Sequence, residues 1–166
     1  MLWPGILLVV WMVVAFVFPY LALPFVRREP LPSRFPRDLE EACEQLSNAS
    51  ATPYEFIKES TDYLLSQHRP SRVSALFFWR EAFEADMRVL LRRRGFLHSN
   101  HLSHLMRVLM SKSQFFSDSD IRLRYTILNF RLHHYLQVKV AGQWFDVDVA
   151  GVAWGVSLGR HAQFFA

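Results

Sequence analysis

The stretch His133-His134-Tyr135-Leu136-Gln137-Val138-Lys139-Val140-Ala141-Gly142-Gln143-Trp144-Phe145-Asp146-Val147-Asp148 decides the fold of the second half of the chain. Polar and apolar residues alternate over 135–140, which is the period of a half-buried strand. Ala141-Gly142 is typical of a two-residue turn, and 143–148 predict a second strand. An antiparallel hairpin of these two strands brings His133 and Asp148, near their far ends, close together.

Helical patterns dominate upstream of this hairpin, and two helices are predicted before residue 68. Residues 38–47 are expected to form a short amphipathic helix. A longer one begins at Thr52-Pro53-Tyr54-Glu55, where Thr52 is the N-cap, Pro53 takes the first helical position and Glu55 closes a capping box. It is expected to run to about Gln67.

Between residues 73 and 113 the predicted structure remains helical. Residues 73–94 place apolar side chains close to helical spacing, Gly95 breaks the run, and Ser99 opens a further helix. The period then changes to two at 121–125. The sequence therefore predicts an α+β domain with a helical first half and an antiparallel sheet in the second half.

The first 26 residues are predicted to form one transmembrane helix, because 2–26 hold no charged residue and are long enough to cross roughly 30 Å of hydrocarbon. A cleaved signal peptide is the alternative, but no basic residue precedes the apolar run and no clear small-x-small site follows it. Four arginines follow the run: Arg27, Arg28, Arg34 and Arg37. By the positive-inside rule we expect a single-pass membrane protein with its N-terminus outside and its soluble domain in the cytoplasm.

Three segments follow from this division: a transmembrane helix over 1–26, a linker over 27–37 and one domain over 38–166. Lipid contact is expected at the first of these. The chain of 166 residues has a net charge of +4 and one cysteine, Cys43, so no internal disulfide framework is predicted. No glycine-rich phosphate loop or basic stripe interleaved with aromatics is present, so nucleic-acid binding is not expected.

Two blocks of residues are similar to transglutaminase-like proteins, a branch of the papain-like fold. The first block consists of Gly95, Ser99, Leu102, Leu105 and Arg107, and the second of His133, Tyr135, Val138, Gly142, Trp144 and Asp148. The resemblance covers roughly 75–160 and implies a papain-like fold with a triad at Ser99, His133 and Asp148. The chain departs from the family at Ser99, where the family has its nucleophilic cysteine, and at Val149, where it usually has proline.

The first departure bears on catalysis. In the family, a helix N-terminus and an imidazolium lower the pKa of the thiol, so that a thiolate exists at neutral pH. A serine hydroxyl has no comparable ionised population and needs the histidine to take its proton during attack. Ser99 is therefore open to three interpretations: a helix N-cap in an inactive site, the nucleophile of a working triad, or a laboratory replacement of cysteine.

Histidines suggest a weaker alternative, a metal site at His98, His101 and His104, which recur every three residues. Zinc ligands on a helix are more usually an i, i+4 pair with a carboxylate nearby, so we expect no metal and no cofactor.

The sequence leads to two functional hypotheses. The first is a catalytically inactive, membrane-anchored, transglutaminase-like domain that acts as an accessory or structural subunit. Its N-terminal helix and domain surface would contact a larger integral membrane protein complex. The second is a hydrolase or acyltransferase acting on amide or ester bonds, with Ser99 as nucleophile, His133 as base and Asp148 orienting the histidine.

Overall fold

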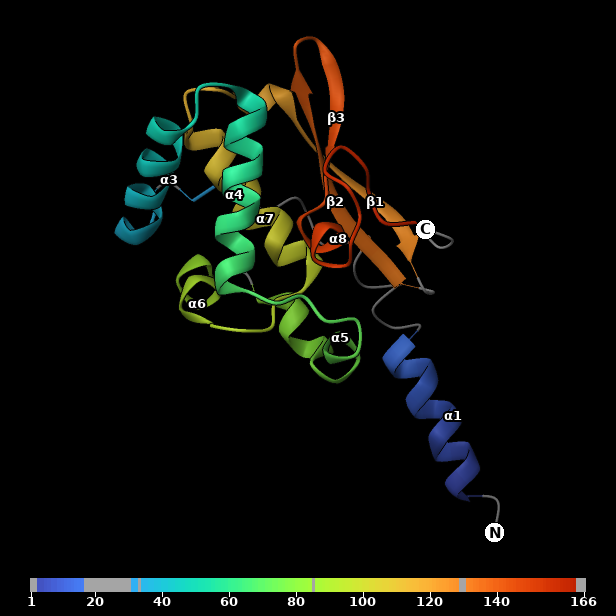
Figure 1. Cartoon of the computed structure of the whole chain (residues 1–166). Helices are drawn as coiled ribbons and strands as arrows, with labels where there is room; N and C mark the ends of the chain where they lie inside the picture. The colour runs from blue at the N-terminus through green and yellow to red at the C-terminus, as the bar shows by residue number, and fades with distance from the viewer. Residues whose placement is uncertain (1–2, 17–30, 33, 85, 129–130, 164–166) are drawn as a thin grey trace.

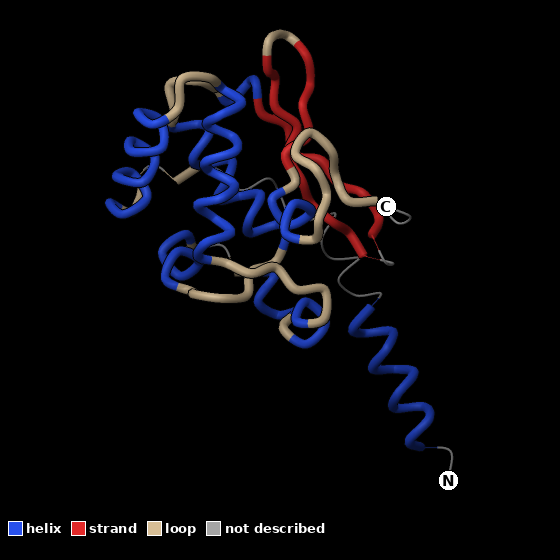
Figure 2. The backbone as a smooth tube through the Cα atoms, in the orientation of Figure 1, coloured by secondary structure: helices blue, strands red, loops and turns tan. Residues whose placement is uncertain are grey.

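The computed structural model describes residues 3–16, 31–32, 34–84, 86–128 and 131–163. Its elements are α1 (Trp3–Phe16), α3 (Arg37–Ala49), α4 (Pro53–Gln67), α5 (Ser74–Phe77), the 3₁₀ helix η2 (Trp79–Phe83), α6 (Met87–Arg92), α7 (Ser99–Lys112), the 3₁₀ helix η3 (Asp118–Asp120), β1 (Ile121–Leu128), β2 (Arg131–Val140), β3 (Gln143–Val147) and α8 (Val149–Ala153). Helices α3, α4, α6 and α7 lie to one side of the three strands (Figure 2). The α+β class with an antiparallel sheet is confirmed.

Helix α7 lies at the centre of the domain. It contacts β2 and α8 on one side and α3 and α4 on the other (Figure 1). Its apolar residues point in most directions, and those fully buried include Leu102, Leu105, Met106, Leu109 and Met110. Every residue from 101 to 110 except His104 is buried, the polar His101, Ser103 and Arg107 included, which reflects the central place of the helix.

The sheet has the order β1-β2-β3, and both pairs of neighbouring strands are antiparallel. The predicted hairpin is present: Val140 pairs with Gln143, and the turn residues Ala141 and Gly142 have φ values of 50° and 84°. Positive φ at both positions matches the twist of the flanking strands. This turn fixes the register that carries His133 and Asp148 to the same end of the sheet.

Helix α4 agrees with its predicted limits. The side chain of Thr52 accepts a hydrogen bond from the backbone N–H of Glu55 at 3.2 Å, and Pro53 is the first helical residue. The carboxylate of Glu55 reaches back to the N–H of Ala51 at 2.8 Å.

The helical pattern over 73–94 is divided into α5, η2 and α6. Two backbone carbonyls in this region bond side chains at residues 98 and 100, around the start of α7. The His98 ring bonds the carbonyl of Phe78 at 2.8 Å, and the amide of Asn100 donates to the carbonyl of Ala82 at 2.7 Å. Asp86 then caps α6 by accepting from the N–H of Arg88.

The prediction of a transmembrane helix is wrong. Over the ranges that the structure describes, no helix combines the length and apolar character needed to cross a membrane. Helix α1 has 14 residues. At 1.5 Å per residue it extends about 21 Å, against roughly 30 Å of hydrocarbon. The predicted single-pass membrane location with a cytoplasmic domain is corrected as well, because that prediction depended on a transmembrane helix.

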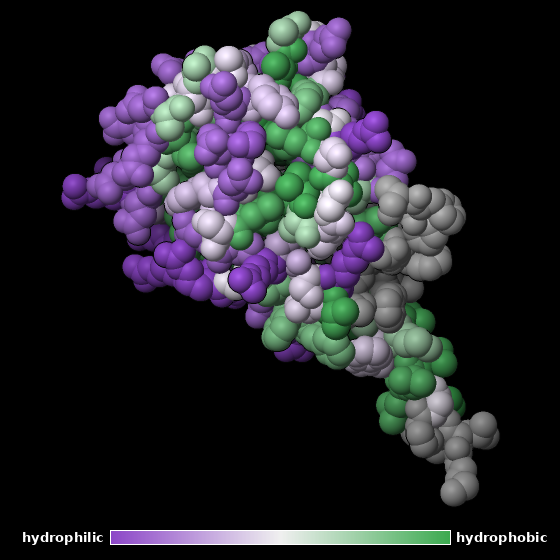
Figure 3. Space-filling model, in the orientation of Figure 1, coloured by the Kyte–Doolittle hydropathy of each residue, from purple (hydrophilic) through white to green (hydrophobic). Residues whose placement is uncertain are grey.

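Helix α1 projects from the domain and is apolar along its exposed surface (Figures 1 and 3). The remainder of the predicted span and the first four residues of the predicted linker, together residues 17–30, lie outside the described residues.

Candidate functional site

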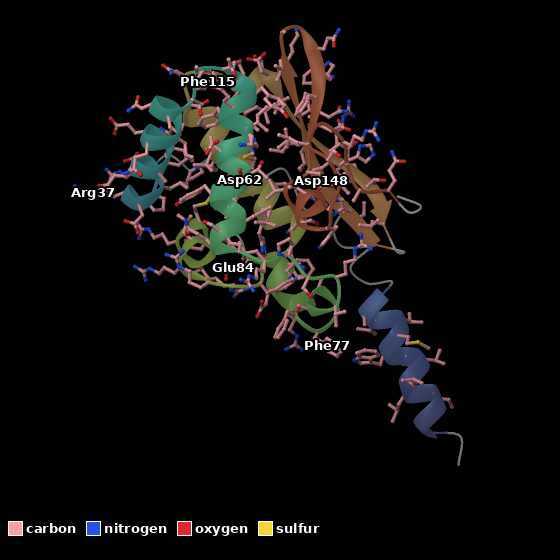
Figure 4. The ribbon with its side chains drawn as sticks, viewed as in Figure 1. Arg37, Asp62, Phe77, Glu84, Phe115 and Asp148 are labelled. Atoms are coloured by element: carbon pink, nitrogen blue, oxygen red, sulfur yellow. The ribbon has the colours of Figure 1, made fainter. Side chains whose placement is uncertain are left out.

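His133 and Asp148 form a buried hydrogen-bonded pair. His133 Nε2 lies 2.7 Å from Asp148 Oδ2, and the two side chains are 3% and 1% exposed. His133 comes from the part of β2 that extends beyond the end of β3, and Asp148 directly follows β3. Figure 4 shows Asp148 between the sheet and the helices.

Asp148 also anchors two backbone segments. Its Oδ1 accepts from the N–H of Gly151 at 2.8 Å, which caps α8, and its Oδ2 accepts from the N–H of Ala162 at 2.9 Å. Position 151 must be glycine for steric reasons, because a Cβ atom there would lie 2.6 Å from Asp148 Cγ. Three hydrogen bonds thus compensate a carboxylate that is removed from water.

Ser99 bonds the backbone next to His133 rather than either side chain of the pair. Its Oγ accepts a long hydrogen bond, 3.4 Å, from the backbone N–H of His134. One turn along α7, Ser103 Oγ donates to the carbonyl of His134 at 3.1 Å. The two serines therefore satisfy both backbone groups of one strand residue, where β3 no longer accompanies β2.

The interpretation of Ser99 as a helix N-cap needs correction. Helix α7 has Ser99 as its first residue and His98 at the N-cap position, and no side chain there makes a capping hydrogen bond. The helix N-terminus at Ser99 is present as predicted, but the hydroxyl connects the helix to the sheet.

The pairing between His133 and Asp148 determines which ring nitrogen could act in proton transfer. In the neutral ring, a carboxylate acceptor at Nε2 places the proton there and leaves Nδ1 with a lone pair. The other side of the ring packs against Trp154, with centroids 5.3 Å apart. In the described part of the chain, Ser99 Oγ and the His133 ring share no hydrogen bond. The structure thus joins His133 to Asp148, whereas Ser99 is bonded to the backbone of the residue that follows His133.

A second histidine–aspartate pair was not predicted. His161 Nδ1 lies 2.6 Å from Asp146 Oδ2, and the His161 ring stacks on Tyr135 with centroids 4.3 Å apart. The backbone carbonyl of Asp146 also accepts a hydrogen bond from the N–H of Gly159. Both contacts of Asp146 therefore hold the C-terminal segment against the sheet. The alternation of β3 places Asp146 beside Gln137, but no local pattern assigns a place to His161.

The three histidines of the metal alternative do not converge. In the described ranges, no three His, Cys, Asp or Glu side chains are grouped so that they could hold a metal ion. The rings of His98 and His101 meet edge to face with centroids 5.6 Å apart. Burial, aided by neighbouring positive charge, lowers the pKa of His101 to about 3 and that of His104 to about 4.

Cys43 is also buried, and its thiol donates to the carbonyl of Leu109 at 3.4 Å. Burial raises its pKa, which makes it a poor nucleophile.

Comparison of the chain with models of protein families, with curated proteins and with solved structures finds no match.

Proposed function

We propose that this chain is a non-catalytic, transglutaminase-like domain that binds other proteins as an accessory subunit of a larger assembly. In this proposal Ser99, His133 and Asp148 hold α7, the sheet and α8 together. The observation that carries it is the hydrogen bond of Ser99, whose hydroxyl accepts from the backbone of His134 while His133 is bonded to Asp148.

Chemical reasoning supports this role. A serine nucleophile requires a base within hydrogen-bond distance of its hydroxyl, since its proton must leave as it attacks. His133 is 3% exposed and Asp148 is 1% exposed, so substrate would have little access to either. A residue that completes the hydrogen bonds of a strand and a helix needs neither a base nor access.

The second candidate is the serine hydrolase or acyltransferase, and one observation favours it. Asp148 bonds Nε2 of the His133 ring, so the neutral ring carries its lone pair on Nδ1, as a general base requires. In this reaction Ser99 Oγ would attack the carbonyl carbon of an ester or amide. Nδ1 would take the hydroxyl proton and pass it to the leaving alcohol or amine, and water would release the acyl group.

Covalent labelling separates the two candidates. The full chain is incubated with a fluorophosphonate and its intact mass is measured, with Ser99→Ala as the matched control. We expect no adduct on either protein. An adduct on the natural sequence that Ser99→Ala abolishes would establish the enzyme. The binding role is tested by native electrophoresis of tagged protein from its source cells, where we expect stoichiometric migration with a larger complex.

A further inference from the structure

One edge of the sheet has no partner strand among the described residues. In the part of the chain that the structure describes, strand β1 pairs with β2 alone, and no residue outside β2 makes a backbone hydrogen bond to residues 122–128. The opposite edge differs, because Gly159 bridges Asp146 on β3. An edge strand of eight residues presents a row of main-chain donors and acceptors that another strand can use.

The bonding of His134 shows which groups of β1 point outward. Residues directly opposite each other in an antiparallel pair either exchange both hydrogen bonds or direct both sets of groups away. His134 uses its N–H and C=O on Ser99 and Ser103, so both point away from β1. Tyr125 lies opposite His134, and its N–H and C=O therefore point away from β2. The same holds for the N–H and C=O groups of residues 123 and 127, two positions to either side.

The side chains of β1 make this edge positively charged on one face of the sheet and aromatic on the other. Arg122 and Arg124 are exposed on the face that they share with Gln137. The guanidinium of Arg122 lies 3.7 Å from the centroid of the Trp144 ring, and Arg124 Nε donates to Gln137 at 3.0 Å. Neither has a carboxylate at ion-pair distance among the described residues. Tyr125, on the other face, is 63% exposed.

We propose that β1 is the docking site for an extended acidic segment of a partner protein, which adds to the sheet as a fourth strand. This inference rests on the proposed binding function. The main chain of the segment bonds the outward groups around Tyr125, and alternate acidic side chains lie beside Arg122 and Arg124. An apolar side chain between them packs on Tyr125. Both arginines are directed across the sheet, so neither of these two side chains covers the edge.

Charge argues against a second copy of this chain as the occupant. Two β1 strands paired antiparallel about Arg124 or about Leu123 would place arginines opposite each other, which is destabilising. Pairing about Tyr125 would place Arg124 opposite Thr126, and there only the net charge opposes it. The net charge of +4 adds repulsion between copies. An acidic partner removes both costs and gives Arg122 and Arg124 counter-charges.

The test uses the full chain and two labelled octapeptides, one alternating Glu and Val and one alternating Lys and Val, with binding followed by fluorescence anisotropy. We expect the Glu-Val peptide to bind in a salt-sensitive manner and the Lys-Val peptide to bind at least about tenfold more weakly. Equal binding of the two peptides, or no binding of either, would overturn the proposal.

Tyr125→Pro is the decisive variant, because it removes an outward N–H and leaves the hydrogen bonds between β1 and β2 intact. We expect about tenfold weaker binding of the Glu-Val peptide, whereas Tyr125→Thr keeps the N–H and retains most of the affinity. If Tyr125→Pro does not fold, a Glu-Val peptide methylated on alternate backbone nitrogens tests the same hydrogen bonds from the ligand side. Unchanged affinity in either experiment contradicts strand addition.

Experiments on the native complex distinguish a failure of this inference from a failure of the proposed function. If the complex forms and Tyr125→Pro leaves it intact, the edge inference fails and the binding role stands. If no complex forms and Ser99 reacts with the fluorophosphonate, the proposed function itself fails.

Discussion

Gly151 keeps the buried carboxylate of Asp148 in place by having no side chain. In Gly151→Ala, the new methyl group would overlap that carboxylate, so its hydrogen bonds to His133 and Ala162 would be lost or lengthened. We expect the free energy of unfolding to fall by about 2–4 kcal/mol, measured by urea denaturation. Gly5→Ala is the matched control, because a Cβ atom there meets nothing within 4 Å. Equal urea midpoints for the two variants would contradict the role given to Gly151.

Ser99 and Ser103 bond the same strand residue with different strength, and this difference is measurable. Ser103 is buried and donates at 3.1 Å, whereas Ser99 is half-buried and accepts at 3.4 Å. Ser103→Ala is expected to cost about 1–2 kcal/mol of stability and Ser99→Ala about 0.5 kcal/mol, by urea denaturation of each variant. An increase in stability for Ser99→Ala would instead point to a serine retained for activity at the expense of stability.

At the scale of the element, α7 and the strand against it carry buried histidines that make the domain sensitive to acid. Burial lowers the pKa of His101 to about 3 and those of His104 and His134 to about 4. The unfolded chain binds these protons near pH 6.5, so it takes up protons first as the pH falls. Stability is therefore complete above about pH 6.5 and declines between about pH 6.5 and 4, by up to about 1.4 kcal/mol per pH unit for each such histidine.

The substitution His101→Leu tests this sensitivity at one position. His101 is 2% exposed and neither ring nitrogen has a hydrogen-bond partner among the described residues. The carbonyl of Ala82, which raises its pKa slightly, accepts from Asn100 instead. We expect His101→Leu to change stability little at pH 7.5 and to raise it relative to the natural sequence at pH 5, by urea denaturation at both values. A parallel loss at both pH values would show that the ring is required for packing.

Elements defined by local signals could be predicted from the sequence, and those defined by distant contacts could not. The cap at Thr52 and the turn at Ala141-Gly142 depend on a few adjacent residues, and the turn register also brings His133 to Asp148. The breaks within 73–94 depend on side chains around the start of α7, and the pairing of His161 with Asp146 depends on how the C-terminal segment crosses the sheet. Periodicity carries no information on either.

At the scale of the whole molecule, α1 is separate from the domain. Residues 6–14 are all 42–63% exposed, and α1 does not pack extensively against another described element. Ala15 is buried at its C-terminal end, but one methyl group contributes about 0.8 kcal/mol at most. The stability of the domain therefore resides in the core around α7.

A chain of residues 31–166 tests this separation. We expect its free energy of unfolding to match that of the full chain within about 1 kcal/mol, measured by urea denaturation followed by circular dichroism. We also expect it to self-associate less in sedimentation velocity, because the contiguous apolar surface of α1 has been removed. The full chain with Ile6, Val10 and Val13 changed to Gln is the matched control, since it keeps the length of the chain while breaking that surface. A large loss of stability in the truncated chain but not in the control would show that α1 supports the fold through its backbone, and the core around α7 would then be incomplete without it.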